Sequence, residues 1–242
     1  MQSLRWQVVL YKMLQMSSFA AKISTQYGKY LLLGIDFAFI VASIWRAQLG
    51  LGGGEDLFAV SKDGGYAEQF QYIQFAGVIL LLSLLAVRAK SALSGGWAMI
   101  FSILLADDKL ALHETWGTYL AGWFSFQPLF RLRAVDYGEM TVFALWGLIS
   151  LSILSTADLI DQSAVGLKVS KALFLSLLGF AFFGAFFDML HIVVLDIYTL
   201  TFMQNNVFDA IEDGGEMIVI SLVLWFVYRT FVEALHDAQR EG

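Results

Sequence analysis

The chain has 242 residues, of which 58% are hydrophobic and only 15% are charged. A typical soluble domain has about 25% charged residues, so a soluble fold of this length would need far more polar surface. The net charge of −6 and the lack of a basic cluster argue against nucleic acid as a partner. Because the sequence contains no cysteine, disulfides, thiolate metal ligands and cysteine nucleophiles are excluded. We therefore expect an integral membrane protein whose main partner is the lipid bilayer.

The N-terminal segment, residues 1–28, mixes basic residues with scattered apolar ones. No uninterrupted apolar stretch and no small-residue cleavage site follow, so the pattern is not typical of a cleaved signal peptide. It favours an amphipathic helix that lies in the membrane interface.

Six apolar runs follow, each near the roughly 20 residues that a helix needs to cross the hydrocarbon core. Glycine-rich turn signals and a loop around Pro128 separate them. The predicted fold is all-α, a single membrane domain over residues 1–242 with about six transmembrane helices. We place these at residues 30–49, 69–88, 96–122, 138–156, 170–195 and 207–232.

Lysine and arginine predict the orientation, because cytoplasmic loops of membrane proteins are enriched in them. With a cytoplasmic N-terminus, the cytoplasmic side holds Arg5, Lys12, Lys22, Lys29, Arg88, Lys90, Lys168, Lys171, Arg229 and Arg240. The other side holds Arg46, Lys62, Arg131 and Arg133. The asymmetry predicts that both termini are cytoplasmic, which agrees with an even number of spans.

Ionisable residues interrupt three of the six runs. They are Asp107, Asp108, Lys109, His113 and Glu114 in the third, Asp188 and His191 in the fifth, and Asp209, Glu212, Asp213 and Glu216 in the sixth. A charge at the bilayer centre costs at least about 2.5–3.5 kcal/mol on insertion scales. These side chains should therefore face one another, a metal ion or water.

Helical geometry supports a shared location. At about 100° per residue, Asp107, His113 and Glu114 fall within a sector of about 120°, whereas Asp108 points away. Asp188 and His191 are three residues apart and share a face. The four acids of the sixth run cover about 100°. With the expected orientation, all three groups lie in the outer half of the membrane.

Carboxylates with two imidazoles are ligands that a divalent metal such as zinc, iron or manganese uses. The predicted metal ligands are Asp107, His113, Glu114, Asp188, His191, Glu212 and Glu216. A carboxylate such as Glu114 or Glu216 could act as a general base toward a metal-bound water.

The segments DDKLALHE (107–114) and IEDGGEM (211–217) resemble a group of uncharacterised bacterial multi-pass membrane proteins. That group has a D-E-x-x-x-x-H-E pattern in one span and E-E-x-x-E in a late span. Here Asp108 and Asp213 stand where the pattern has glutamate, and Lys109 where it has a small residue. The resemblance implies a bacterial inner-membrane protein with a shared site, and no particular reaction. A looser similarity links the chain to ceramidase-like membrane hydrolases, although the three histidines of that pattern are not all within spans here.

Structural roles are expected for several other residues. Lys109 is expected to neutralise Asp108 or an acid on a neighbouring helix, and Asp36 to be an interfacial or packing acid near the cytoplasmic end of its span. Asp136 and Glu139 stand at a helix start, where they would act as caps. The small residues Gly179, Gly184 and Ala185 would allow close helix approach.

Three functions fit these observations. The first is a metal-dependent membrane enzyme, hydrolytic or oxidative, that acts on a lipid or lipid-soluble substrate. The second is an accessory or structural subunit of a larger membrane complex, with other membrane proteins as partners, in which the polar cluster holds the bundle together. The third is a proton or cation transporter, which would also need acids in the inner half, where only Asp36 is available.

Overall fold

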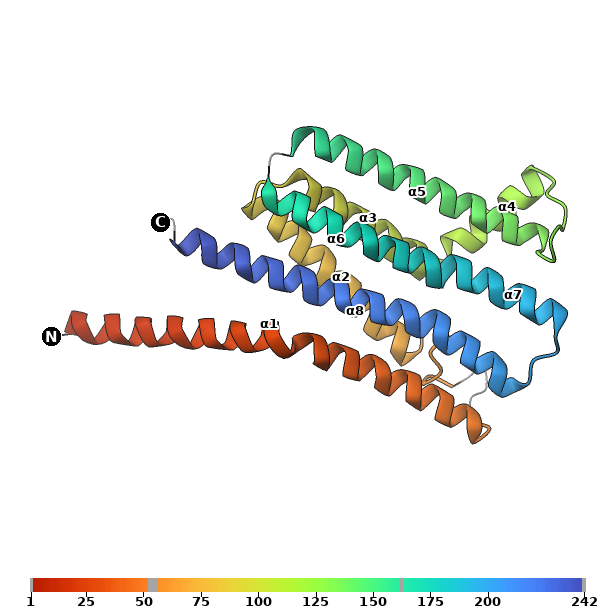
Figure 1. Ribbon diagram of the computed structural model, residues 1–242, viewed down its shortest axis with the longest axis horizontal. Helices are drawn as coiled ribbons and strands as arrows, with labels where there is room; N and C mark the ends of the chain where they lie inside the picture. Colours follow the sequence, from red (N-terminus) through yellow and green to blue (C-terminus); the bar gives the residue numbers. More distant parts are fainter. Residues whose placement is uncertain (1, 52–55, 162, 241–242) are drawn as a thin grey trace.

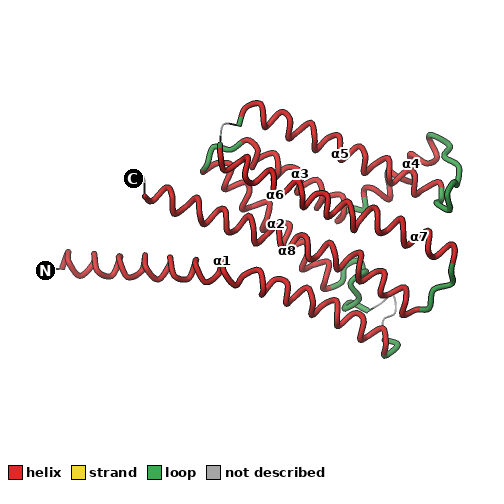
Figure 2. Tube along the Cα trace, in the orientation of Figure 1, coloured by secondary structure: helices red, strands yellow, loops and turns green. Residues whose placement is uncertain are grey.

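The computed structural model describes residues 2–51, 56–161 and 163–240, and side chains from residues 25–51, 56–161 and 163–236. The described chain is helical, apart from its loops and one isolated bridge between Leu129 and Leu132 (Figures 1 and 2). The helices are α1 (Gln2–Gln48), α2 (Tyr66–Arg88), α3 (Ala92–Lys109), α4 (Leu112–Trp123), α5 (Ala134–Ile160), α6 (Ala164–Ala181), η1 (Phe182–Phe187), α7 (Asp188–Ile197) and α8 (Phe202–Arg240). The all-α prediction is confirmed.

Five helical segments are long and apolar enough to cross a membrane. They are Thr25–Gln48, Tyr66–Arg88, Ala134–Ile160, Ala164–Ile197 and Phe202–His236. Large apolar side chains such as Leu31, Val87 and Leu159 are more than 65% exposed on the outside of the bundle. Lipid is the solvent that suits such a surface, and the chain is a multi-pass membrane protein.

The prediction of one continuous transmembrane helix over residues 96–122 is wrong. Helix α3 ends at Lys109, and Ala111 has left-handed backbone angles (φ 46°, ψ 47°) before α4 begins. The charged Asp107–Lys109 segment therefore ends a helix of 18 residues. The chain still traverses the bundle here, because α3 runs toward the end where α4 and the start of α5 lie (Figure 1).

The N-terminal segment is also not separate from the first span. Residues 2–48 form one continuous helix, without the break that an independent interfacial helix would need. Residue 1 lies outside the described residues. Helix α1 begins and α8 ends at the same end of the bundle, as an even number of passes requires (Figure 1).

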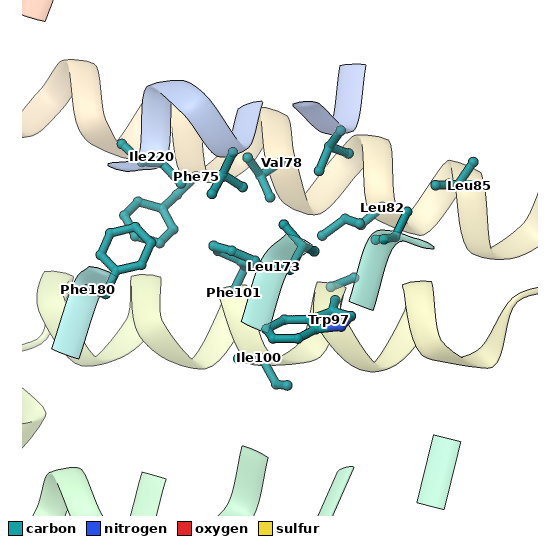
Figure 3. Close-up of a cluster of buried hydrophobic side chains, with 14 residues drawn as sticks. Phe75, Val78, Leu82, Leu85, Trp97, Ile100, Phe101, Leu173, Phe180 and Ile220 are labelled. Atoms are coloured by element: carbon teal, nitrogen blue, oxygen red, sulfur yellow. The ribbon is translucent and has the colours of Figure 1, made fainter. Parts of the chain in front are cut away.

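The apolar core lies between α2, α3, α6 and α8 (Figure 3). Phe75, Phe101 and Phe180 pack against one another in tilted and edge-to-face arrangements with ring centroids 5.7–6.3 Å apart, and Trp97 packs beside Phe101. Leu82, Leu85, Val223 and Val227 continue the core toward the end where the termini lie. The bundle is therefore apolar inside on the side of its termini.

At that same end, Asp161 joins two turns of the chain. Its carboxylate accepts hydrogen bonds from the Ser91 hydroxyl (2.7 Å), the Leu93 N–H (2.6 Å) and the Ser163 N–H (2.7 Å). Partial burial acts to raise the pKa of Asp161, but these hydrogen bonds outweigh it and hold the pKa below its usual value. The turn between α2 and α3 is thereby fastened to the turn between α5 and α6.

Candidate acid and histidine site

The opposite end of the bundle is polar inside. The acidic cluster consists of Asp107, Asp108, Glu139, Asp188, Asp209, Glu212, Asp213 and Glu216, which come from α3, α5, α7 and α8. His113 of α4 and His191 of α7 lie among them. The acidic side chains of three spans were expected to face one another. Helix α6 packs against both α3 and α8, so the α6–η1–α7 helix is the neighbour that the other two share.

His113 and Asp107 form the first part of the site. The Asp107 carboxylate is 6% exposed, lies 2.9 Å from Nδ1 of His113 and accepts a 2.9 Å hydrogen bond from the Trp146 indole. In a continuous helix, residues six apart would be about 120° apart around the axis and about 9 Å apart along it. The left-handed turn at Ala111 brings them together. The His113 ring also stacks on Phe143, with centroids 5.0 Å apart.

His191 forms a second, separate part. The side chain is buried, its Nε2 lies 2.9 Å from the Asn205 amide oxygen, and its ring stacks on Phe208 with centroids 4.8 Å apart. Its Nδ1 lies 3.6 Å from Glu212 and 3.9 Å from Asp209. Asn205 was not expected from the sequence, and it fixes which imidazole nitrogen faces the two acids.

Glu216 lies deeper along α8, against the π-helical segment η1. A Cβ atom on Gly184 would lie 1.9 Å from Oε1 of Glu216, so the glycine leaves the space that the carboxylate fills. The other carboxylate oxygen accepts a 3.4 Å hydrogen bond from the Gln71 amide of α2. Gly184 thus allows the close approach that was expected from the sequence, and the side chain that it admits is Glu216. A π-helical turn within an α-helix is frequently found at functional sites.

Asp188 lies between the two histidines. It is close enough to both His113 and His191, and to Asp136, to interact with them electrostatically. Glu139 belongs to the same group, because its backbone and Cγ pack directly against Gly117 of α4. Asp188 and Glu139 therefore connect the two histidine-containing parts.

Of the two acids expected to cap α5, only Asp136 does so. Its fully buried carboxylate accepts hydrogen bonds from the Arg133 N–H (2.6 Å) and the Arg133 guanidinium (2.6 and 2.9 Å). This carboxylate raises the pKa of the Arg133 guanidinium. Glu139 lies one turn deeper, in the site, because the close crossing of Gly117 and Gly138 brings α4 against this part of α5.

Two residues differ from their expected surroundings. Glu114, expected as a ligand or base, is exposed on α4. The Lys109 ammonium lies 4.7 Å from the centre of the Tyr72 ring, and no ion pair joins it to a carboxylate among the described side chains. The expected neutralisation of Asp108 by Lys109 is wrong, because the cation packs on an aromatic face instead.

The described residues include no group of three or more His, Asp or Glu side chains arranged to hold a metal ion. The seven expected ligands divide into Asp107 with His113, His191 with Glu212, and Glu216 beside Gln71, with Asp188 between the histidines and Glu114 exposed. A metal centre made of all seven stays a prediction.

Asp36 was expected as an interfacial or packing acid, and the structure buries it between helices, with polar partners that were not predicted. It lies on α1, is 0% exposed, and faces Ser221 of α8 and Gln74 of α2. The signal that was overlooked is the pair Gln71 and Gln74, two amides one helical turn apart in an otherwise apolar span. Amides at this spacing mark a polar face.

Comparisons of the chain with protein-family models, with curated proteins and with solved structures found no match.

Proposed function

We propose that this multi-pass membrane protein takes up and transfers protons through the acidic cluster from one face of the membrane. The observation that carries the proposal is the excess of carboxylates over basic partners. Among the described side chains, the basic partners of the cluster are His113 with Asp107 and His191 with Asp209 and Glu212, while Arg133 and Arg131 pair with Asp136 and Asp196 outside it. Asp188, Asp213 and Glu216 form none of these pairs.

Several neighbouring carboxylates cannot all be ionised in a poorly solvated interior, because like charges and desolvation both penalise the charged form. Glu212, Asp213 and Glu216 stand within one turn of α8 and interact with one another electrostatically. Protons are the simplest cations that can neutralise them. Histidine exchanges protons near neutral pH, and each histidine of the site contacts at least one carboxylate.

The test is proton uptake by vesicles that contain the purified full-length protein and a trapped pH-sensitive dye. A potassium diffusion potential, negative inside, should drive acidification above that of protein-free vesicles. The double variant E212Q/E216Q should lose this uptake. The matched control is D158N, because Asp158 is an exposed acid of α5 outside the cluster. Equal uptake by E212Q/E216Q and the unaltered protein would contradict the proposal.

A metal-dependent enzyme that acts on a lipid-soluble substrate is the second candidate. The observation in its favour is that Nδ1 of His191 lies within 4 Å of both Glu212 and Asp209, which are residue types that bind divalent metals. Metal analysis of protein purified in detergent, without added chelator, tests it. Bound zinc, iron or manganese in a fixed ratio to protein, without proton uptake, would favour the enzyme. Protein with neither property would favour an accessory subunit.

A further inference from the structure

The Asp36 carboxylate is a buried acid that lies outside the acidic cluster and that the proposed function does not yet use. Both of its oxygens are buried and neither has a hydrogen-bond partner among the described residues. No charged side chain of the described helices interacts with it electrostatically; the polar groups facing it are Ser221 and Gln74. An isolated buried carboxylate is costly in its ionised form, and such groups mark functional sites within membranes.

The neighbours of Asp36 offer it few hydrogen-bond donors. The Gln74 amide donates its Nε2–H to the Ser221 hydroxyl at 2.6 Å, and its Oε1 is buried without a partner. The Ser221 hydroxyl and the Gln74 amide are the donors that face three buried oxygens, two from Asp36 and one from Gln74, none of which has a hydrogen bond of normal geometry among the described residues. A proton on Asp36 would remove its uncompensated charge and add a donor to this region. A metal cation such as calcium would need six to eight oxygen ligands, more than this region offers.

A row of polar side chains leads from the acidic cluster to Asp36. Glu212 and Glu216 are one turn apart on α8, and the Gln71 amide donates to Glu216. Gln74 follows Gln71 by one turn of α2 and bonds to Ser221, which faces Asp36. We name Glu212, Glu216, Gln71, Gln74 and Ser221 the polar path.

The polar path ends at Asp36. On the far side, the interior positions of α2 and α8 are held by Val78, Leu82, Leu85, Val223 and Val227, all at most 1% exposed. Gln74, which faces Asp36, lies about 12 Å along α2 from Tyr66 and about 21 Å from Arg88, so Asp36 lies within the apolar length of the bundle and away from its ends. The path thus connects the acidic end of the bundle with this interior position, and onward transfer to the other end requires water or a movement of the helices.

We infer that Asp36 is a proton-binding site in the membrane interior, loaded from the acidic cluster through the polar path. The inference rests on the proposed function, since it names the group that receives the protons that the cluster takes up. During loading, a proton moves from a carboxyl group of the cluster to an Asp36 oxygen, leaving the donor ionised and Asp36 neutral. No bond other than O–H is formed or broken.

Infrared spectroscopy of the full-length protein in lipid bilayers, with carboxyl-13C aspartate, tests the site directly. We expect an isotope-shifted band of a protonated carboxyl at neutral pH that is absent from D36N and retained by D158N. The band should move on transfer to deuterated water. In Q74L this exchange should slow at least about tenfold, the factor produced by 1.36 kcal/mol of added barrier. A control, L80A, alters an exposed side chain of the same helix and should leave the exchange rate unchanged.

The outcomes separate the two proposals. If D36N retains the complete band, Asp36 is ionised and the inference is overturned, whatever the vesicles do. If the band belongs to Asp36 but exchange is as fast in Q74L as in the unaltered protein, the polar path is not its route and the inference is likewise overturned. If the band and the exchange behave as expected but vesicles take up no protons, the proposed function fails and Asp36 remains a proton-binding site.

Discussion

Glu216 and Gly184 are fitted to each other, since the carboxylate of one fills the space where a Cβ atom of the other would stand. This contact joins α8 to the α6–η1–α7 helix. It also restricts Glu216 to the position where Gln71 can donate to it.

Substitution of Gly184 by Ala should therefore displace the Glu216 side chain and reduce proton uptake by vesicles severalfold or more. The added methyl would lie 1.9 Å from Oε1, too close for any contact, although the side chain can turn away. The control is G147A in α5, where a Cβ meets nothing within 4 Å. That change should preserve uptake and stabilise the helix by about 0.5–1 kcal/mol. Normal uptake by G184A would show that Glu216 need not hold this position.

Substitution of Gly138 by Ala should be far more damaging to the fold. Its Cβ would lie 1.9 Å from the backbone carbonyl oxygen of Gly117, which cannot rotate away. We expect α4 and α5 to separate, with a loss of stability of about 3 kcal/mol or more, above the usual range for overpacking. Thermal unfolding in detergent measures this. Gly122→Ala, on the open side of α4, should unfold at nearly the original temperature.

The stability of the Asp161 junction should depend on pH in the acid range. Because the folded protein holds the pKa of Asp161 below its usual value, the stabilisation is complete above the unfolded pKa of about 3.9. This stabilisation is lost as the pH falls through the lower pKa that Asp161 has in the folded protein. D161N should lower stability by about 2 kcal/mol at neutral pH and lose less than the unaltered protein on acidification. If the unfolding temperatures of D161N and the unaltered protein fall by the same amount between about pH 7 and about pH 3, the prediction is refuted.

Zinc binding by the purified protein should depend on His191 and not on His113. Only His191 has two carboxylates, Glu212 and Asp209, within 4 Å of one ring nitrogen, whereas His113 contacts Asp107, whose other oxygen is held by Trp146. H191A should lower the affinity for zinc at least about tenfold, as loss of a ligand or its support does. H113A should retain it. Equal losses in both variants would instead support the single shared ion predicted from the sequence.

The helical membrane fold was predictable because apolar runs of suitable length are recorded directly in the sequence. The break at Ala111 was not, since the Asp107–Lys109 segment could equally belong to a continuous helix with charges facing inward. The two histidines were identified correctly as residues of the polar interior. Their division between different partners depends on Trp146 and Asn205, which come from other helices and carry no sequence signal of their own.

Asp36 shows a second limit of the sequence. It was expected near the end of its span, whereas it faces Gln74, which lies about 12 Å into α2 from Tyr66. Its burial could not be predicted, because it depends on how α1 packs against α8, a contact in which Gly214 of α8 lets Ile40 of α1 approach closely.

The π-helical segment η1 has an evolutionary consequence. A π-helical turn holds about one residue more than an α-helical turn, so the segment Phe182–Phe187 absorbs an extra residue within the span. If the same sequence wound as a regular α-helix, every residue beyond it, including Asp188 and His191, would rotate by about 100° and shift by about 1.5 Å relative to α6. Loss of one codon in this segment would instead remove the extra residue and let a regular α-helix hold both side chains nearly in place. A deletion here is therefore the change in length that this interior would tolerate best.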